Sequence, residues 1–178
     1  DITALEEVSF EVEAGDFVFI TGPSGSGKTT IVKLILREFL PTSGSITVDG
    51  VSIEKIKPKQ IIELRRKVGV VFQDFKLLSD RTVFENVCLP LEVIGKNGKE
   101  IEEKVHESLK LVGLEERENL FPAQLAGGEL QRTCIARAVV GNPKILIADE
   151  PTGNLDPVTS SQIAKLLKKI NKMGTTIL

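Results

Sequence analysis

The sequence predicts an α/β fold, in which a parallel sheet is flanked by helices and the chain carries a helical insertion. Residues 17–21 and 145–149 are apolar runs that end in a polar residue, which is typical of buried parallel strands. Residues 22–29 separate the first run from a helix-like run at 31–39 and read G-x-x-x-x-G-K-S/T. Residues 74–140 have helical character. Strands at both ends and helices between them indicate an α/β core with an inserted block.

Strand-like runs recur along the chain. The first of them, residues 8–12, alternates apolar and polar side chains, so it predicts a half-exposed antiparallel strand at the edge of the fold. Glycine-rich stretches at 41–44 and 49–50 predict turns between strands. The expected strands cover residues 8–12, 17–21, 45–49, 68–72, 145–149 and 175–178.

Further helices are expected where apolar residues recur on one face. Residues 99–111 place such side chains four apart, and residues 129–140 end at Gly141. Asp156 and the proline after it form an N-cap and first-turn pair, which opens a helix that stops at Gly174.

Length and composition indicate one domain. We expect a core formed by residues 1–73 and 141–178 and a helical subdomain at about 74–140. The 41% hydrophobic content suffices for a core, and the net charge of −2 gives no indication of a nucleic-acid partner. No apolar run reaches the roughly 18 residues that a membrane helix needs, so a role at a membrane would require a partner.

Three side chains are expected to have structural roles only. Cys88 and Cys134 lie far apart in apolar surroundings without C-x-x-C spacing, which indicates reduced, packed thiols in a cytosolic protein. The single histidine, His106, lies on the charged side of its helix, so we expect it to be solvated rather than catalytic.

The glycine motif predicts a phosphate site. Glycines let successive backbone N–H groups turn inward, and the N-terminus of the following helix adds a positive dipole end. Lys28 can reach the β- and γ-phosphates, and the Thr29 hydroxyl can ligate Mg²⁺. The alternative is a plain Gly/Ser-rich turn. The expected phosphate-binding residues are Gly22, Pro23, Ser24, Gly25, Ser26, Gly27, Lys28, Thr29 and Thr30.

Two further motifs gain meaning beside this loop. The strand at 145–149 ends in Asp149, and Glu150 follows; the first acid can hold Mg²⁺, and the second can accept a proton from attacking water or orient it. Gly127 and Gly128 precede a helix and can expose its first N–H groups as a second anion site. The alternatives are two solvated acids and an ordinary Gly-Gly turn.

Taken together, these motifs resemble those of the ATP-binding cassette (ABC) ATPases, in the same order and over nearly all of the chain. The resemblance implies the P-loop NTPase fold of an ABC nucleotide-binding domain, with ATP as substrate and Mg²⁺ as cofactor. It implies that Thr29, Gln73 and Asp149 form the Mg²⁺ shell, and that Glu150 and Gln73 are catalytic. It further assigns a signature to Leu125, Ala126, Gly127, Gly128 and Glu129, and a D-loop to Asn154, Leu155 and Asp156.

The resemblance also implies partners. Two chains would bind two ATP molecules head to tail, with the signature of one capping the γ-phosphate held by the other. Ala126 replaces the usual signature serine, which removes one hydroxyl. An integral membrane partner would contact the surface near Gln73, where Phe75, Leu77 and Leu78 are candidates; their alternative role is local core.

Residues 72–78 and 81–87 are most similar to the cell-division subfamily of these ATPases. That similarity implies an FtsX-type membrane partner and a peripheral position on the cytoplasmic face of the bacterial plasma membrane. The alternatives are the ATPase of a lipoprotein-releasing or export transporter and a nucleotide-dependent assembly module with little turnover.

The two ends of the family pattern fall outside this sequence. The aromatic residue that stacks on adenine should precede Asp1, and the switch histidine should fall about four residues beyond Leu178. We therefore expect the chain to be the motif-bearing core of a longer protein.

Overall fold

The computed structural model describes residues 3–178. Its parallel sheet contains β3 (Val68–Val71), β4 (Ile145–Ala148) and β5 (Thr176–Ile177) in that order. Val68 lies opposite Ile145, and Ile145 lies opposite Thr176. A separate antiparallel pair is formed by β1 (Thr47–Val48) and β2 (Val51–Ser52).

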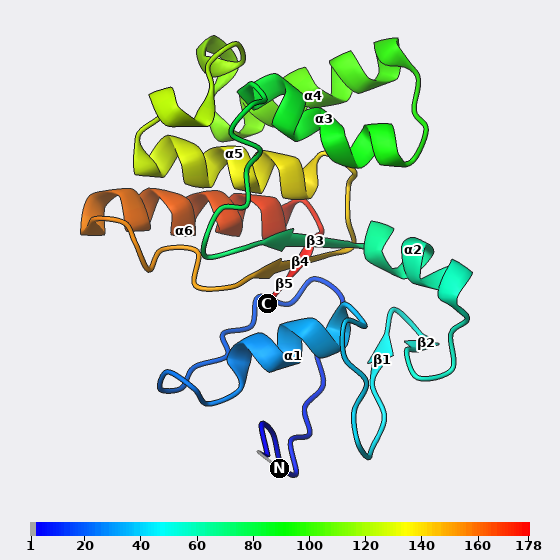
Figure 1. Ribbon diagram of the computed structural model, residues 1–178. Helices are drawn as coiled ribbons and strands as arrows, with labels where there is room; N and C mark the ends of the chain where they lie inside the picture. Colours follow the sequence, from blue (N-terminus) through cyan, green and yellow to red (C-terminus); the bar gives the residue numbers. More distant parts are fainter. Residues whose placement is uncertain (1–2) are drawn as a thin grey trace.

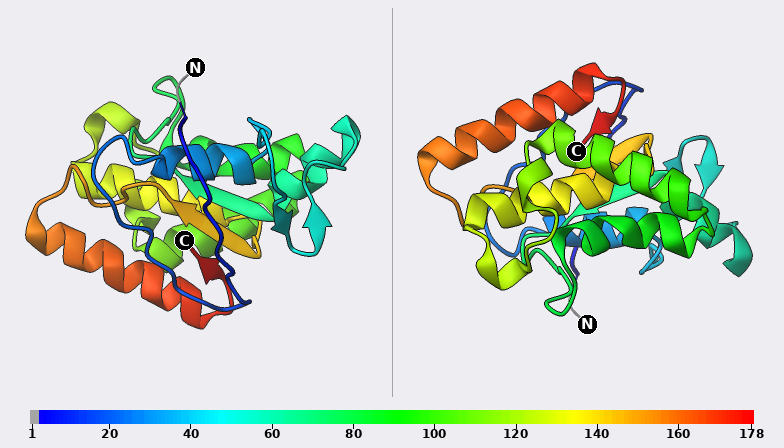
Figure 2. Two further views of the ribbon diagram at one scale, coloured as in Figure 1. Left: turned by 90° about the horizontal axis from the view of Figure 1, so that it is seen from below. Right: turned by 90° about the horizontal axis from the view of Figure 1, so that it is seen from above.

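Helices cover both faces of the parallel sheet (Figure 1). On one face lies α1 (Lys28–Ile35), and on the other lie α5 (Gly127–Val139) and α6 (Pro157–Lys172). Figure 2 shows α1 in front of the sheet from below and α5 in front of it from above. The remaining elements are α2 (Pro58–Arg66), α3 (Val83–Val93), α4 (Gly98–Val112), η1 (Glu115–Arg117) and η2 (Pro122–Gln124).

Alternation along β4 separates two apolar clusters. Ile147 packs with Leu36 and Val68 on the α1 face. Leu146 packs on the opposite face in a larger cluster that continues through α5 into α3 and α4. Because successive strand side chains point to opposite faces, one short strand contributes to both clusters. The α/β class predicted from the apolar runs is therefore confirmed.

Gly69 in β3 sets how closely α5 approaches the sheet. A Cβ atom at this position would overlap the Ala138 carbonyl oxygen of α5 and lie 3.1 Å from Pro143 Cγ. Glycine is therefore required here for close approach of two backbones rather than for a turn. This contact fixes α5 relative to the strand that leads to Gln73.

The helical part of the chain is built from α3, α4 and α5, which pack against one another above the sheet in Figure 1. Val87, Leu109 and Ile135, one from each helix, are completely buried. Among residues 3–178, no helix is long and apolar enough to cross a membrane.

Two of the expected strands differ in the structure. Residues 8–12 form no strand, and the antiparallel edge is instead the β1–β2 pair. Residues 17–21 contribute a single parallel bridge, Phe17 to Ile177, beside the two-residue β5. Alternation and apolarity predict which face a strand buries but not whether a partner strand lies within reach, and pairing decides strand formation.

The expected helices are present with shifted ends. The helix expected at 31–39 runs from Lys28 to Ile35, and the helix expected at 99–111 is α4. α2 was not predicted. The predicted cap of α6 is confirmed, because Asp156 Oδ1 accepts hydrogen bonds from Val158 N at 2.9 Å and Thr159 N at 3.0 Å.

Candidate functional site

The glycine loop leads directly into α1. Gly25 and Gly27 have φ angles of 81° and 90°, in the left-handed region that glycine adopts without strain. Gly27 is the N-cap of α1, and no side chain caps the helix there. The first-turn N–H groups of α1 are therefore not occupied by a side-chain cap, which is the arrangement that binds anions at helix N-termini.

The Lys28 ammonium lies at the mouth of this loop. It donates hydrogen bonds to the carbonyl oxygens of Gly22 at 2.9 Å and Pro23 at 3.0 Å. The same nitrogen lies 3.9 Å from Glu150 Oε1. Lys28 and Glu150 are therefore far apart in sequence but adjacent in the fold.

Thr29 and Asp149 meet beside them. The Thr29 hydroxyl donates a hydrogen bond to Asp149 Oδ2 at 3.1 Å. Asp149 is positioned from its backbone, because its N–H donates to the Val71 carbonyl of β3 at 2.9 Å. Two oxygen donors next to a phosphate-type loop suit Mg²⁺, which typically takes one or two protein ligands and completes its shell with phosphate and water.

Glu150 has an unusual backbone. Its φ angle of 48° places a non-glycine residue in the left-handed region. Its carbonyl accepts a hydrogen bond from Gly153 N at 3.1 Å, which begins a tight turn. The side chain is 47% exposed, so the carboxylate is open to water. Such strained positions persist where the surrounding structure imposes them, and they are common at functional sites.

Gln73 lies on a turn at the end of β3. Phe75 N donates to the Phe72 carbonyl at 3.3 Å, so Gln73 and Asp74 are the central residues of that turn. β3 and β4 run parallel, so Gln73 and Asp149 leave the sheet at the same edge. Within residues 3–178, no hydrogen bond joins the Gln73 side chain to Thr29 or Asp149.

The Gly-Gly turn begins α5, with Ala126 as the N-cap. Glu129 Oε2 accepts a hydrogen bond from Ala126 N at 2.9 Å, and Glu129 Oε1 accepts one from Arg117 Nε at 2.9 Å. The hydrogen bond from Arg117, and then that from the Ala126 N–H, lowers the pKa of Glu129. The signature residues are therefore held in place by an ionised capping side chain.

The Gly-Gly turn also lies next to the predicted D-loop. A Cβ atom on Gly128 would lie 2.6 Å from Thr159 Cγ2, and one on Gly127 would lie 3.5 Å from Leu155 Cδ2. In the described part of the chain, no hydrogen bond or ion pair links residues 125–129 to the glycine loop. The structure thus brings Lys28, Thr29, Asp149 and Glu150 together and leaves the signature apart from them.

The three apolar residues after Gln73 have mixed environments. Phe75 and Leu77 are partly buried and pack against the large apolar cluster. Leu78 is 43% exposed. Phe75 and Leu77 therefore make core contacts, which was the alternative to a role at a partner surface. Leu78 is available at the surface.

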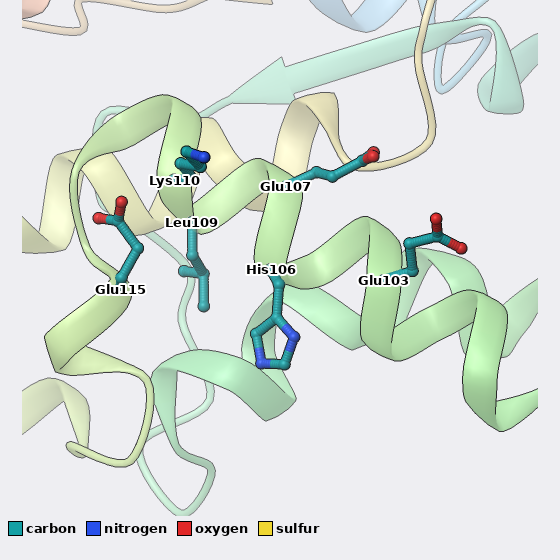
Figure 3. A pocket seen from close by; sticks show the side chains of 6 residues that line it. All are labelled: Glu103, His106, Glu107, Leu109, Lys110 and Glu115. Atoms are coloured by element: carbon teal, nitrogen blue, oxygen red, sulfur yellow. The ribbon is translucent and has the colours of Figure 1, made fainter.

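Both cysteines are free and buried, as the sequence predicts. Burial raises the pKa of Cys88 to about 11 and that of Cys134 to about 12. His106 Nε2 lies 3.1 Å from Glu118 Oε2, and the ring packs 5.6 Å from that of Phe84. His106 lines a surface pocket on α4 with Glu103 and Glu107 (Figure 3). α4 and α1, which follows the glycine loop, lie on opposite sides of the sheet in Figure 1.

Comparison with known proteins places this geometry in a family. The ABC transporter family model matches residues 5–153. The cell division ATP-binding protein FtsE of Streptococcus pneumoniae is 54% identical over 99% of this chain and 76% of the relative. The methionine import ATP-binding protein MetN of Vibrio vulnificus is 48% identical over 100% of this chain and 52% of the relative.

A solved structure agrees with the sequence relatives. The dimeric structure of an ATP-binding cassette in a post-hydrolysis state, bound to ADP and Pi, has a TM-score of 0.87 and 40% identity. It covers 98% of this chain and 78% of the solved chain. The chain therefore belongs to the ABC transporter family and is an ATP-hydrolysing cassette of that family.

Proposed function

We propose that this chain is the ATPase subunit of an FtsEX-like membrane complex in bacterial cell division. The observation that carries its chemistry is the meeting of Lys28, Thr29, Asp149 and Glu150 at one edge of the sheet. The similarity to FtsE supports the cell-division assignment. We also propose a RecA-like core at about 1–73 and 141–178, with a helical subdomain at about 74–140.

The glycine loop binds the phosphates of ATP. The N–H groups at the start of α1 and the Lys28 ammonium supply positive charge around the β- and γ-phosphates. Lys28 exchanges its hydrogen bonds to the Gly22 and Pro23 carbonyls for phosphate oxygens. The binding residues are Gly22, Pro23, Ser24, Gly25, Ser26, Gly27, Lys28, Thr29 and Thr30.

Thr29 and Asp149 hold Mg²⁺, with Gln73 reaching it partly through water. The ion, when bound, neutralises charge that develops on the phosphates. Glu150 orients the attacking water and accepts its proton, and its exposed carboxylate beside Lys28 supports that role.

ATP joins two copies of the chain head to tail. The signature, Leu125 to Glu129, caps the γ-phosphate held by the partner subunit, and Asn154, Leu155 and Asp156 lie across the interface. The separation of the signature from the glycine loop within one chain supports this arrangement, as does the similarity to a dimeric cassette. An FtsX-type partner receives the motion at the cytoplasmic face of the plasma membrane, with Leu78 the best-exposed contact candidate.

Replacing Glu150 with Gln tests the hydrolytic assignment in the whole protein. We expect turnover to fall by at least about 100-fold, because the water loses its base, while an ATP-bound dimer accumulates in size-exclusion chromatography. Glu102→Gln on the exposed face of α4 is the matched control and should leave turnover unchanged. Unchanged turnover in Glu150→Gln would contradict the role given to this carboxylate.

A second function, the ATPase of a solute transporter, is favoured by the 48% identity to MetN. The two functions differ in the membrane protein that the cassette binds. Affinity purification from membranes distinguishes the two functions, with the Glu150→Gln variant as the bait and ATP present throughout. Recovery of an FtsX-type protein supports the cell-division function, and recovery of a solute permease supports the transporter.

A further inference from the structure

The backbone after Gln73 is strained at two successive residues. Phe75 and Lys76 have φ angles of 58° and 48°, and neither is glycine. The left-handed conformation costs a residue with a Cβ atom roughly 1–2 kcal/mol, so two in a row require external restraint. The restraint comes from α5, and its charged part is the side chain of Arg137.

Arg137 supplies the restraint with both ends of its guanidinium. One terminal nitrogen donates to the Lys76 carbonyl at 2.6 Å, and the other donates to the Phe75 carbonyl at 2.7 Å. The Phe75 carbonyl also accepts a hydrogen bond from the Cys134 thiol at 3.2 Å, one helical turn earlier. Charge-assisted hydrogen bonds of this length are about twice as strong as neutral ones.

In the described part of the chain, no carboxylate competes with these carbonyls for the Arg137 guanidinium. Among residues 3–178 it forms no ion pair with a carboxylate, and its donors are directed at the two backbone carbonyls. Burial lowers the pKa of its guanidinium, which shows that desolvation has a cost at this position. A half-buried arginine that pairs only with carbonyls is costly as a packing residue, and its two short hydrogen bonds to successive carbonyls indicate a positional role.

The helix that carries Arg137 is itself fixed against β3. The neighbouring residue, Ala138, is the one whose carbonyl oxygen lies against Gly69. This close approach leaves little freedom for α5 to slide along the strand. The guanidinium therefore reaches the strained residues from a fixed base.

The restrained carbonyls lie at the exit of the turn that presents Gln73, on Phe75 and on the residue after it. The turn begins at the end of β3, where the Val71 carbonyl accepts from Asp149 N at 2.9 Å. It closes at Phe75, whose carbonyl Arg137 holds. Further along, fully buried Asn86 donates to the carbonyls of Leu78 at 3.0 Å and Arg81 at 3.1 Å. Arg137 and the Cys134 thiol hold the segment between these anchors.

We propose that Arg137 is a positioning residue for hydrolysis, which holds the strained residues Phe75 and Lys76 by their carbonyls and thereby fixes the turn of Gln73 that precedes them. Without this fork the two residues relax toward ordinary backbone angles, and Gln73 is no longer held at the end of the sheet where Asp149 also lies. The inference rests on the role proposed above for Gln73 in the Mg²⁺ shell. It predicts a loss of turnover without a matching loss of ATP binding.

The series Arg137→Lys and Arg137→Met tests this in the whole protein with its membrane partner. Lysine keeps the charge but cannot donate to both carbonyls in a fixed fork. We expect kcat to fall about tenfold in Arg137→Lys and further in Arg137→Met, with the KM for ATP changed less than about twofold. Arg66→Met at the exposed end of α2 is the control. A rise in KM that matches the fall in kcat would overturn the proposal.

A double-mutant cycle separates positioning from general loss of structure. If Arg137 acts through Gln73, then Gln73→Ala combined with Arg137→Lys should turn over no more slowly than Gln73→Ala alone. Multiplying losses would overturn the inference. The melting temperature of Arg137→Lys should stay close to that of the unmodified protein, which keeps the cycle interpretable. If Gln73→Ala alone leaves turnover unchanged, the proposed function of Gln73 fails instead.

Discussion

The Thr29 hydroxyl and the Asp149 carboxylate are joined by a 3.1 Å hydrogen bond across 120 positions of sequence. Thr29 lies in the first turn of α1, and Asp149 follows β4, so the contact joins the start of this helix to the end of the strand. Both groups present hard oxygen donors, which is the ligand type that Mg²⁺ prefers. The pair is the best-defined part of the candidate metal site.

Removing the Thr29 hydroxyl should weaken the effect of Mg²⁺ on ATP binding. Thr29→Val keeps the shape of the side chain, and we expect Mg²⁺ affinity in the ATP complex to fall at least about tenfold. Calorimetric titration with ATP, in Mg²⁺ and then in EDTA, measures the difference. Thr42→Val on the exposed loop before β1 is the control. A Thr29→Val protein that responds to Mg²⁺ like the unmodified protein would remove Thr29 from the site.

Placing a serine at position 126 should stabilise the protein. Ala126 is the N-cap of α5, with extended backbone angles that suit a capping serine. We expect Ala126→Ser to raise the free energy of unfolding by about 0.5–2 kcal/mol, because its hydroxyl can accept a hydrogen bond from a first-turn N–H. Chemical denaturation measures the change, and Ala123→Ser in η2 is the control. An equal gain in both variants would argue against capping.

The close approach of α5 to β3 should make Gly69 intolerant of any side chain. Gly69→Ala places a Cβ against the Ala138 carbonyl, and we expect a loss of about 1–3 kcal/mol in the free energy of unfolding. Gly98→Ala is the matched control, since a Cβ there meets nothing within 4 Å. We expect no loss in the control, and equal losses in the two variants would contradict the packing argument.

Protonation of Asp49 should make the protein less stable in acid. Hydrogen bonds from Lys67 and then Lys144 lower the pKa of this carboxyl below its ordinary value. Because the pKa is lower in the folded protein, the ionised carboxylate stabilises the fold above about pH 4. This stabilisation is lost as the pH falls through the folded-state pKa. We therefore expect Asp49→Asn to cost up to about 1 kcal/mol at pH 7, with the difference closing below pH 4. Denaturation at several pH values checks the sign.

Both thiols should be inert in the native protein. Cys88 and Cys134 are buried with raised pKa values, so neither presents a thiolate at pH 8. We expect a thiol reagent such as DTNB to react with both only after unfolding. Release of one or two equivalents of chromophore from the folded protein within minutes would show that the burial is incomplete.

Much of the site could be predicted because each motif is local. The glycine spacing around Lys28, the acids after the β4 run and the cap at Asp156 depend on residues a few positions apart, and such patterns encode their own hydrogen bonds. The roles of the motif residues stay predictions, as does the division into core and helical subdomain.

Contacts between distant segments could not be predicted in the same way. The alternation in residues 8–12 indicated a strand, but strand formation requires a partner, and the antiparallel edge forms at Thr47 to Ser52 instead. The clamp of Arg137 on Phe75 and Lys76 has no sequence pattern, because its acceptors are backbone carbonyls that every residue carries.

By itself, the sequence determined the α/β class and the residues that bring phosphate chemistry, because hydrophobic period and turn chemistry act over a few neighbouring residues. Only the tertiary structure decided the direct contacts: the Thr29 hydroxyl bonds to the Asp149 carboxylate, Glu150 lies beside Lys28, and Arg137 of α5 holds the Phe75 carbonyl after Gln73. These contacts depend on how helices pack against the sheet, and packing is set by the whole core rather than by any one segment.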